Sequence, residues 1–134
     1  MSSMTCDIVT PAKKLYTQEC YMVVVPGELG EMGFMPGHAP LVSSLADGVV
    51  RVYSDASTLT QTYALQGGYV QVTGEKVIIL ADKAIPVSEI DVDAVKAQIA
   101  ELEAQAAKLP EDSSDRALLD IDLAWCRLQE RTAQ

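Results

Sequence analysis

The sequence is poor in the residues that build most active sites. Its 134 residues include one histidine, one phenylalanine, one tryptophan and no asparagine. The three cysteines, Cys6, Cys20 and Cys126, lie far apart without a C-x-x-C spacing, so neither a zinc knuckle nor a dithiol redox motif can be written. We therefore expect reduced, partly buried thiols, which suit a cytoplasmic protein.

Basic residues and long apolar runs are also scarce. Ten Lys and Arg residues are scattered among nineteen acids, for a net charge of −9, whereas a nucleic-acid binder needs a clustered basic footprint. Nucleic acid and anionic lipid are therefore poor partners. Apolar runs such as Val23 to Val25 and Val77 to Ala81 are too short to cross a bilayer, so we expect no direct bilayer insertion and only a peripheral membrane role.

Short β-type runs fill the first two thirds of the chain. They recur between Gly, Pro, Asp and Ser residues: TCDIV, ECYMVVV, GFM, LVSSL, GVVRVYS, TQTYALQ, GYVQVT and KVIILA. In GYVQVT, Val70 and Val72 face one way, while KVIILA is apolar on both faces and indicates a central strand. This pattern predicts an antiparallel β-sandwich over about residues 4 to 85, within a domain spanning 1–87.

The period becomes helical in the second predicted domain, 88–134. Ser88 or Asp91 can cap a first helix that Pro110 ends, and Ser113 or Ser114 can cap a second. Both helices are expected to span about twenty residues and to form an antiparallel hairpin. Each has an apolar seam at steps of three and four: Val92, Val95, Ile99, Leu102, Ala106 and Leu109 in the first, and Leu118, Ile121, Trp125, Leu128 and Thr132 in the second.

A row of alanines lies opposite the first seam. Ala97, Ala100, Ala104 and Ala107 also recur at steps of three and four. Alanine is the best helix former on a solvent-exposed face, so the row can be plain surface. It can also be a second, low-profile packing surface.

The stretch PGELGEMGFMPGHAP, residues 26 to 40, is the most unusual in the chain. Its G-x-x-G-x-x-G spacing is not the dinucleotide fingerprint, no G-K-[ST] follows, and Glu28 and Glu31 would repel a phosphate. A metal site would need partners for the sole histidine, His38, which is better suited to organising the loop. The acid pairs Asp91/Asp93 and Asp120/Asp122 point to different sides of their helices. We therefore predict no catalytic residue, no metal and no cofactor.

Glycine and proline give this stretch a shape suited to protein contact. Glycines let a partner's backbone approach closely, and prolines fix the shape before docking. An interaction protein is the reading that these residues favour.

Several segments together resemble one family. The runs DIVTP (7–11), VVVPGELGEMGFMPGHAPLVSSL (23–45), GVVRV (48–52), GGYVQV (67–72), VIILADKA (77–84) and EIDVDAVKA (89–97) look like the epsilon subunit of bacterial F-type ATP synthases. The resemblance covers the whole chain in the same order. The block G-x-x-G-x-x-G-x-x-P-G-H-A-P-L is its most specific part.

The resemblance implies a non-catalytic rotor subunit on the cytoplasmic face of the bacterial plasma membrane. The sandwich would bind the gamma subunit and the c-ring and pass torque between proton flow and the catalytic hexamer. The hairpin would fold down on the sandwich, or extend along gamma to the beta subunit and block ATP hydrolysis. The implied contact residues, with Glu31 foremost, are Gly27, Glu28, Gly30, Glu31, Gly33, Pro36, Gly37, His38, Ala39, Pro40 and Leu41.

Two departures from the family pattern concern regulation. Many members carry I-D-x-x-R-A for ATP binding; Ile90 and Asp91 match here, but Ala94 replaces the arginine, which predicts weak or absent ATP binding and leaves N-capping as the main role of Asp91. The resemblance also implies that basic residues of the second helix pair with an acidic segment of the catalytic beta subunit during inhibition. Here Arg116, Arg127 and Arg131 are balanced by acids of the same helix, which predicts only weak electrostatic attraction to beta.

Two other classes remain open from the residues alone. One is an enzyme on a sandwich scaffold, which the single histidine disfavours. The other is an adaptor whose hairpin forms a coiled coil with an unrelated protein.

Overall fold

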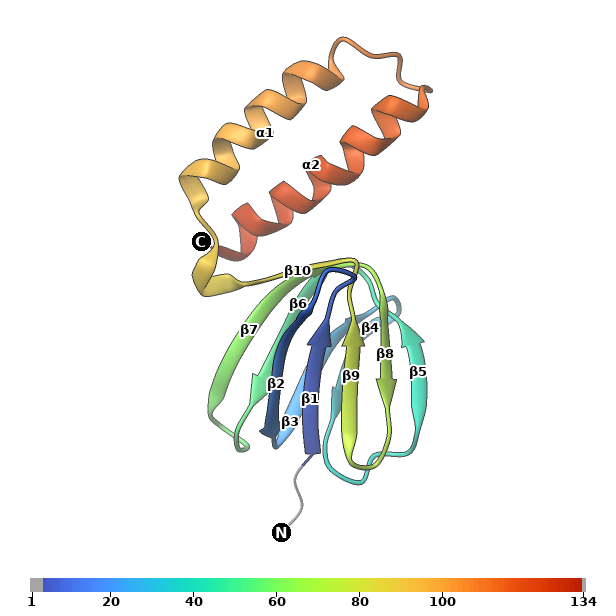
Figure 1. Ribbon diagram of the computed structural model, residues 1–134, viewed down its shortest axis with the longest axis vertical. Coiled ribbons are helices and arrows are strands. Elements are labelled where there is room, and N and C mark those ends of the chain that lie inside the picture. The colour runs from blue at the N-terminus through green and yellow to red at the C-terminus, as the bar shows by residue number, and fades with distance from the viewer. Residues whose placement is uncertain (1–3, 134) are drawn as a thin grey trace. The chain divides into compact units, whose positions relative to one another are not determined.

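The computed structural model describes residues 4–133, which form two compact units, one ending at Pro86 and one beginning at Val87. The first unit is a β-sandwich of two five-stranded sheets (Figure 1). Its strands are β1 (Met4–Val9), β2 (Lys14–Cys20), β3 (Met22–Gly27), β4 (Gly30–Phe34), β5 (Leu41–Ser44), β6 (Gly48–Tyr53), β7 (Leu59–Gln66), β8 (Tyr69–Val72), β9 (Lys76–Leu80) and β10 (Lys83–Pro86).

The strand order places one predicted strand at the centre and adds two that the pattern missed. One sheet has the order β2-β1-β9-β8-β5 and the other β10-β7-β6-β3-β4, so β9, the KVIILA run, is central as predicted. The missed strands β2 and β10 are both at sheet edges. The run ECYMVVV is not one strand, because the chain bends at Tyr21 between β2 and β3.

The sandwich is not wholly antiparallel. β1 and β9 pair in parallel, with Cys6 opposite Val77 and Ile8 opposite Ile79, whereas every other ladder among the described strands is antiparallel. Side-chain alternation is the same in both arrangements, so the sequence pattern could not separate them.

Alternating valines and isoleucines from both sheets build the core. Val70 and Val72 are buried while Tyr69 and Gln71 are exposed, which confirms the predicted facing of this strand. The largest fully buried side chain is Phe34, at the end of β4. The inner face of each sheet is therefore a continuous apolar layer that fixes the register of the edge strands.

The second unit contains η1 (Val87–Glu89), α1 (Val92–Ala106) and α2 (Ser114–Ala133), and the two α-helices run antiparallel (Figure 1). Asp91 is the N-cap of α1 because its Oδ1 accepts the Ala94 N–H at 3.1 Å. Ser113 Oγ accepts the Arg116 N–H at 3.1 Å and caps α2. The 15 residues of α1 are fewer than expected, so Leu109 lies beyond the helix end.

The seam predicted for α2 is wrong at two positions. Leu118 and Ile121 are 63% and 51% exposed, whereas Leu123 and Cys126 are buried against α1 with Leu119 partly buried beside them. Both sets have helical spacing, and the buried set includes a cysteine, which packs as a small apolar side chain. Spacing alone therefore could not decide which of the two stripes faces α1.

Two further predictions concern cysteine and membrane crossing. Cys6, Cys20 and Cys126 are buried and form no disulfide. Within residues 4–133, neither α-helix is long and apolar enough to traverse a bilayer.

Candidate functional site

A tight hairpin joins β3 to β4 at one edge of the sandwich. Gly27 and Gly30 are the last paired residues, and Glu28 and Leu29 form the turn between them. Gly30 has φ +131°, and a Cβ on Gly27 would lie 2.6 Å from the Gly30 carbonyl oxygen. These two glycines are therefore required by the turn itself.

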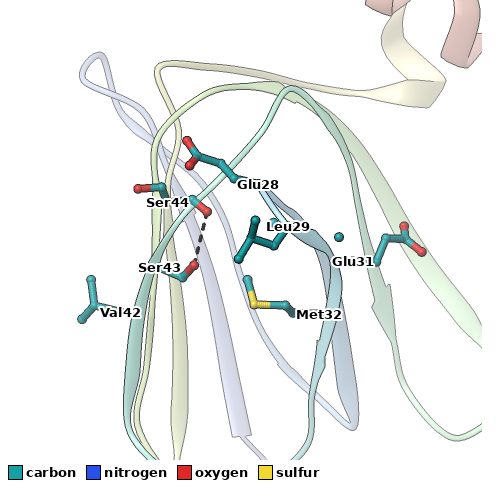
Figure 2. A pocket seen from close by; sticks show the side chains of 9 residues that line it. Glu28, Leu29, Glu31, Met32, Val42, Ser43 and Ser44 are labelled. Atoms are coloured by element: carbon teal, nitrogen blue, oxygen red, sulfur yellow. Dashed lines mark hydrogen bonds between the residues drawn. The ribbon is translucent and has the colours of Figure 1, made fainter.

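The turn presents an apolar side chain next to a hollow. Leu29 is fully exposed, and a cavity of about 410 Å³ lies between the hairpin and β5 (Figure 2). β4 pairs only with β3, and β5 pairs only with β8, so the hollow separates the edge strands of two different sheets. It is lined by Gly27, Glu28, Leu29, Gly30, Glu31, Met32, Val42, Ser43 and Ser44.

Glu31 lies on the outer face of β4 and is ion-paired within the chain. Arg51 of β6 donates from Nη1 to Oε2 and from Nη2 to Oε1, each at 3.1 Å. The hydrogen bonds to Glu31 and then Tyr53 raise the pKa of Arg51 above its ordinary value. The family resemblance implied a contact role for Glu31, but the sequence gave no sign of this partner on another strand.

The P-G-H-A-P block forms the loop between β4 and β5. Gly37 has φ +86°, and its N–H donates to the Gly74 carbonyl at 2.8 Å. His38 Nδ1 lies 2.7 Å from the Ala39 carbonyl oxygen, and its ring packs edge-to-face on Phe34 with centroids 5.0 Å apart. His38 thus holds the loop against the core, the role that the sequence favoured. Pro36 and Pro40 are the first and last residues of this block, and Leu41 begins β5.

The other predicted residues lie in the helical unit. Ile90 is partly buried against the hairpin core, next to the cap Asp91. Arg116 donates to the Ala106 carbonyl at 3.0 Å and pairs with Asp120 at 3.4 Å. It therefore satisfies a carbonyl at the end of α1.

Arg127 pairs with Glu103 of α1 at 2.8 Å. Arg116 and Arg127 both line a cavity of about 270 Å³ between the two helices. Arg131 is exposed in the last turn of α2. Two of the three arginines are thus already paired with acids inside the hairpin.

A buried carboxylate in the first sheet was not anticipated. Asp7 of β1 is 4% exposed; Thr17 Oγ1 donates to it at 2.5 Å, and Lys76 and Lys14 lie 3.3 and 3.8 Å away. Burial alone would raise the pKa of Asp7, but the hydrogen bonds from Thr17 and Lys76 and the two lysine charges lower it overall. The group is fully partnered and has a structural role.

No cluster of three potential metal ligands occurs among residues 4–133. The β3–β4 turn and β4 therefore form a shaped protein edge with a fully exposed leucine and an ion pair between Glu31 and Arg51.

The sequence and fold match known proteins over most of their length. The family described as ATP synthase, Delta/Epsilon chain, beta-sandwich domain matches residues 3–87, which gives the class. An ATP synthase epsilon chain of Granulibacter bethesdensis is 35% identical over 92% of this chain and 93% of the relative. The "ATP synthase epsilon chain, sodium ion specific" of Propionigenium modestum is 37% identical over 97% and 89%. The chain belongs to the ATP synthase epsilon-chain family.

Solved structures show the same fold. A chain in the structure of the Euglena gracilis mitochondrial ATP synthase, OSCP/F1/c-ring, superposes with a TM-score of 0.78 at 22% identity, covering 100% of this chain and 83% of that one. A chain of the Tetrahymena thermophila central stalk and c-ring gives 0.60 at 12% identity.

Proposed function

We propose that this chain is a non-catalytic central-stalk subunit of an F-type ATP synthase that couples the gamma subunit to the c-ring. The observation that carries the proposal is similarity to epsilon chains over most of their length, at 35–37% identity. The exposed β3–β4 edge supports it because an unpaired edge beside an exposed leucine needs a partner. The subunit then associates peripherally with the membrane, on its cytoplasmic face.

The edge residues 27–41 supply the contact with the ring in this proposal, and Glu31 is the residue to test first. We expect Glu31→Lys to weaken assembly onto the ring, because it places a second cation beside Arg51 and removes the carboxylate. The measurement is co-purification of the ring and gamma with the tagged full-length chain, together with ion-driven ATP synthesis. Undiminished co-purification and synthesis would contradict the proposal for this residue. Glu111→Lys, in the loop between the helices, is the matched control.

The helical hairpin of α1 and α2 is proposed to restrain ATP hydrolysis only weakly. In the described state, Arg116 and Arg127 pair with acids of the hairpin itself, so contacts with an acidic segment of the beta subunit would compete with existing pairs. Truncation after Pro110 should therefore raise hydrolysis only modestly in the reconstituted enzyme. A rise of more than about tenfold would mean that the hairpin is a strong latch.

ATP is proposed to bind this chain weakly or not at all. Asp91 already caps α1 by accepting the Ala94 N–H, and Ala94 supplies no cation for a phosphate. Isothermal calorimetry of the full-length chain with ATP should give no saturable heat at low micromolar concentrations. Affinity in that range would overturn this part of the proposal.

An adaptor that binds an unrelated coiled coil is the second candidate. The exposed Leu118 and Ile121 on α2 favour it, because apolar side chains on the outer face of a helix can pack against another helix. A pull-down from the native organism separates the two proposals. The ATP synthase proposal requires gamma as the dominant partner, whereas the adaptor proposal requires a different coiled-coil protein.

A further inference from the structure

The ion pair between Glu31 and Arg51 spans three neighbouring strands on one face of a sheet. Val24 of β3 lies opposite Gly33 of β4 on one side and opposite Arg51 of β6 on the other. Gly33 contributes no side chain to this row, and a Cβ there would touch only Val24, at 3.9 Å. On this outer face no side chain of Gly33 stands in the way, so Arg51 extends across β3 to the Glu31 carboxylate on the edge strand β4.

The pair has the two-pronged geometry that fixes a carboxylate most firmly. Both nitrogens of the guanidinium fork engage, one on each oxygen of Glu31, at 3.1 Å. Such a fork sets the plane of the carboxylate as well as its distance, which a lysine cannot do. The side chain of Arg51 is 34% exposed and that of Glu31 56% exposed, so the arginine is the more enclosed member and Glu31 the one that a partner can reach.

Each carboxylate oxygen has further acceptor capacity after one hydrogen bond from the fork. Glu31 can therefore accept hydrogen bonds from a partner while Arg51 still holds it. Figure 2 shows the Glu31 carboxylate pointing away from Val42 and Ser43 of β5. Holding one side chain in its bound orientation before docking reduces the entropy lost on association.

We propose that Arg51 is a positioning residue for the ring contact: it holds the Glu31 carboxylate ready to accept hydrogen bonds from polar groups of the partner's loops. This inference rests on the proposed function and specifies how one residue of that contact works. Because the pair is neutral overall, the matching groups are uncharged donors, such as amides and hydroxyls, rather than lysine or arginine side chains. Arg51 itself need not touch the ring.

The test compares five full-length chains, the wild type and four variants, for binding to the detergent-solubilised complex of gamma and c-ring from the same organism, together with their melting temperatures. Arg51→Gln should weaken binding about 3- to 10-fold, the cost of ordering one freed side chain. Arg51→Lys should recover only part of this loss, because an ammonium cannot form the fork. Lys13→Gln, which removes an exposed charge in the β1–β2 turn, should bind like wild type.

The reciprocal double variant Glu31→Arg, Arg51→Glu separates positioning from simple stabilisation. It restores an ion pair between the two strands and should recover the melting temperature, but the carboxylate then lies on β6 and binding should stay weak. Wild-type binding by Arg51→Gln, or full recovery of binding by the double variant, would overturn the inference. Failure of the wild-type chain itself to bind the complex would instead refute the proposed function.

Discussion

Two leucines of α2 provide a direct test of the helical hairpin. Leu123 is 4% exposed and belongs to the cluster between the helices, whereas Leu118 is 63% exposed. The periodicity of the sequence alone assigned Leu118, not Leu123, to the seam. Replacing each leucine by alanine in turn removes the same atoms from the same helix, so helix propensity affects both variants equally.

The expected magnitudes differ by more than the error of a stability measurement. Buried Leu→Ala substitutions cost about 2–5 kcal/mol, and a two-helix hairpin can close part of the resulting cavity, so about 2–3 kcal/mol is expected for Leu123→Ala. Leu118→Ala should change the free energy of unfolding by less than about 0.5 kcal/mol. A difference of about 2.5 kcal/mol corresponds to about a 60-fold change in the equilibrium constant of hairpin unfolding.

The only tryptophan of the chain makes the assay selective. Trp125 lies in α2 and is half-buried, so its fluorescence during urea unfolding follows the helical hairpin. The fluorescence midpoint of Leu123→Ala should fall, and that of Leu118→Ala should match wild type. Equal shifts for both variants, or a larger shift for Leu118→Ala, would show that the assignment of the buried face is wrong.

Two further predictions concern the sandwich. The lowered pKa of Asp7 means that its contribution to stability is present above the ordinary carboxyl pKa of about 3.9 and is lost as the pH falls through the lower, folded value. Asp7→Asn should therefore be less stable than wild type at pH 7, by about 1–3 kcal/mol. In urea titrations this difference in the free energy of unfolding should narrow below about pH 4, and a constant difference would contradict the argument. A Cβ at Gly68, where φ is +108°, would lie 1.9 Å from the Leu80 carbonyl oxygen, so Gly68→Ala should lower the free energy of unfolding by about 3 kcal/mol or more. Gly74→Ala is the control: with nothing closer than 4.0 Å to its Cβ, it should lower that free energy by less than about 1 kcal/mol. Similar losses in thermal unfolding would refute the steric argument.

Local patterns were enough for most of the fold. Alternation predicted the buried face of β8 and the central place of β9. Capping chemistry narrowed each helix start to two residues, and the structure selects Asp91 over Ser88 and Ser113 over Ser114. Strands β2 and β10 were missed because they bury few side chains: only Cys20 of β2 and none of β10 is buried, so neither shows a clear alternation. The parallel pairing of β1 with β9 was missed because the two-residue alternation of a strand is the same whether its neighbouring strand runs parallel or antiparallel.

The site could be predicted only in part, since its chemistry depends on register. The glycines and prolines of residues 26–40 indicate a tight, rigid edge by themselves. In GVVRVYS, alternation places Arg51 outward between Val50 and Val52, but it cannot tell which strands lie beside it. Only the order β6-β3-β4 brings Arg51 to Glu31, so the sequence alone could not predict that Arg51 is the partner of the Glu31 carboxylate.

The edges of the two sheets differ in how they are protected. The edge strand β2 carries Lys14 and Glu19, and β10 carries Lys83 and ends at Pro86; charges and proline are the usual means by which proteins prevent edge-to-edge pairing.

On the opposite side, β5 has no charged residue, and the one charge of β4, Glu31, is neutralised by Arg51. The turn beside them exposes Leu29 completely. A free-standing protein with such an edge would risk self-association, whereas a subunit whose edge is covered on assembly would not. The asymmetry of the edges therefore supports the proposal that a partner covers β4, β5 and the β3–β4 turn on assembly.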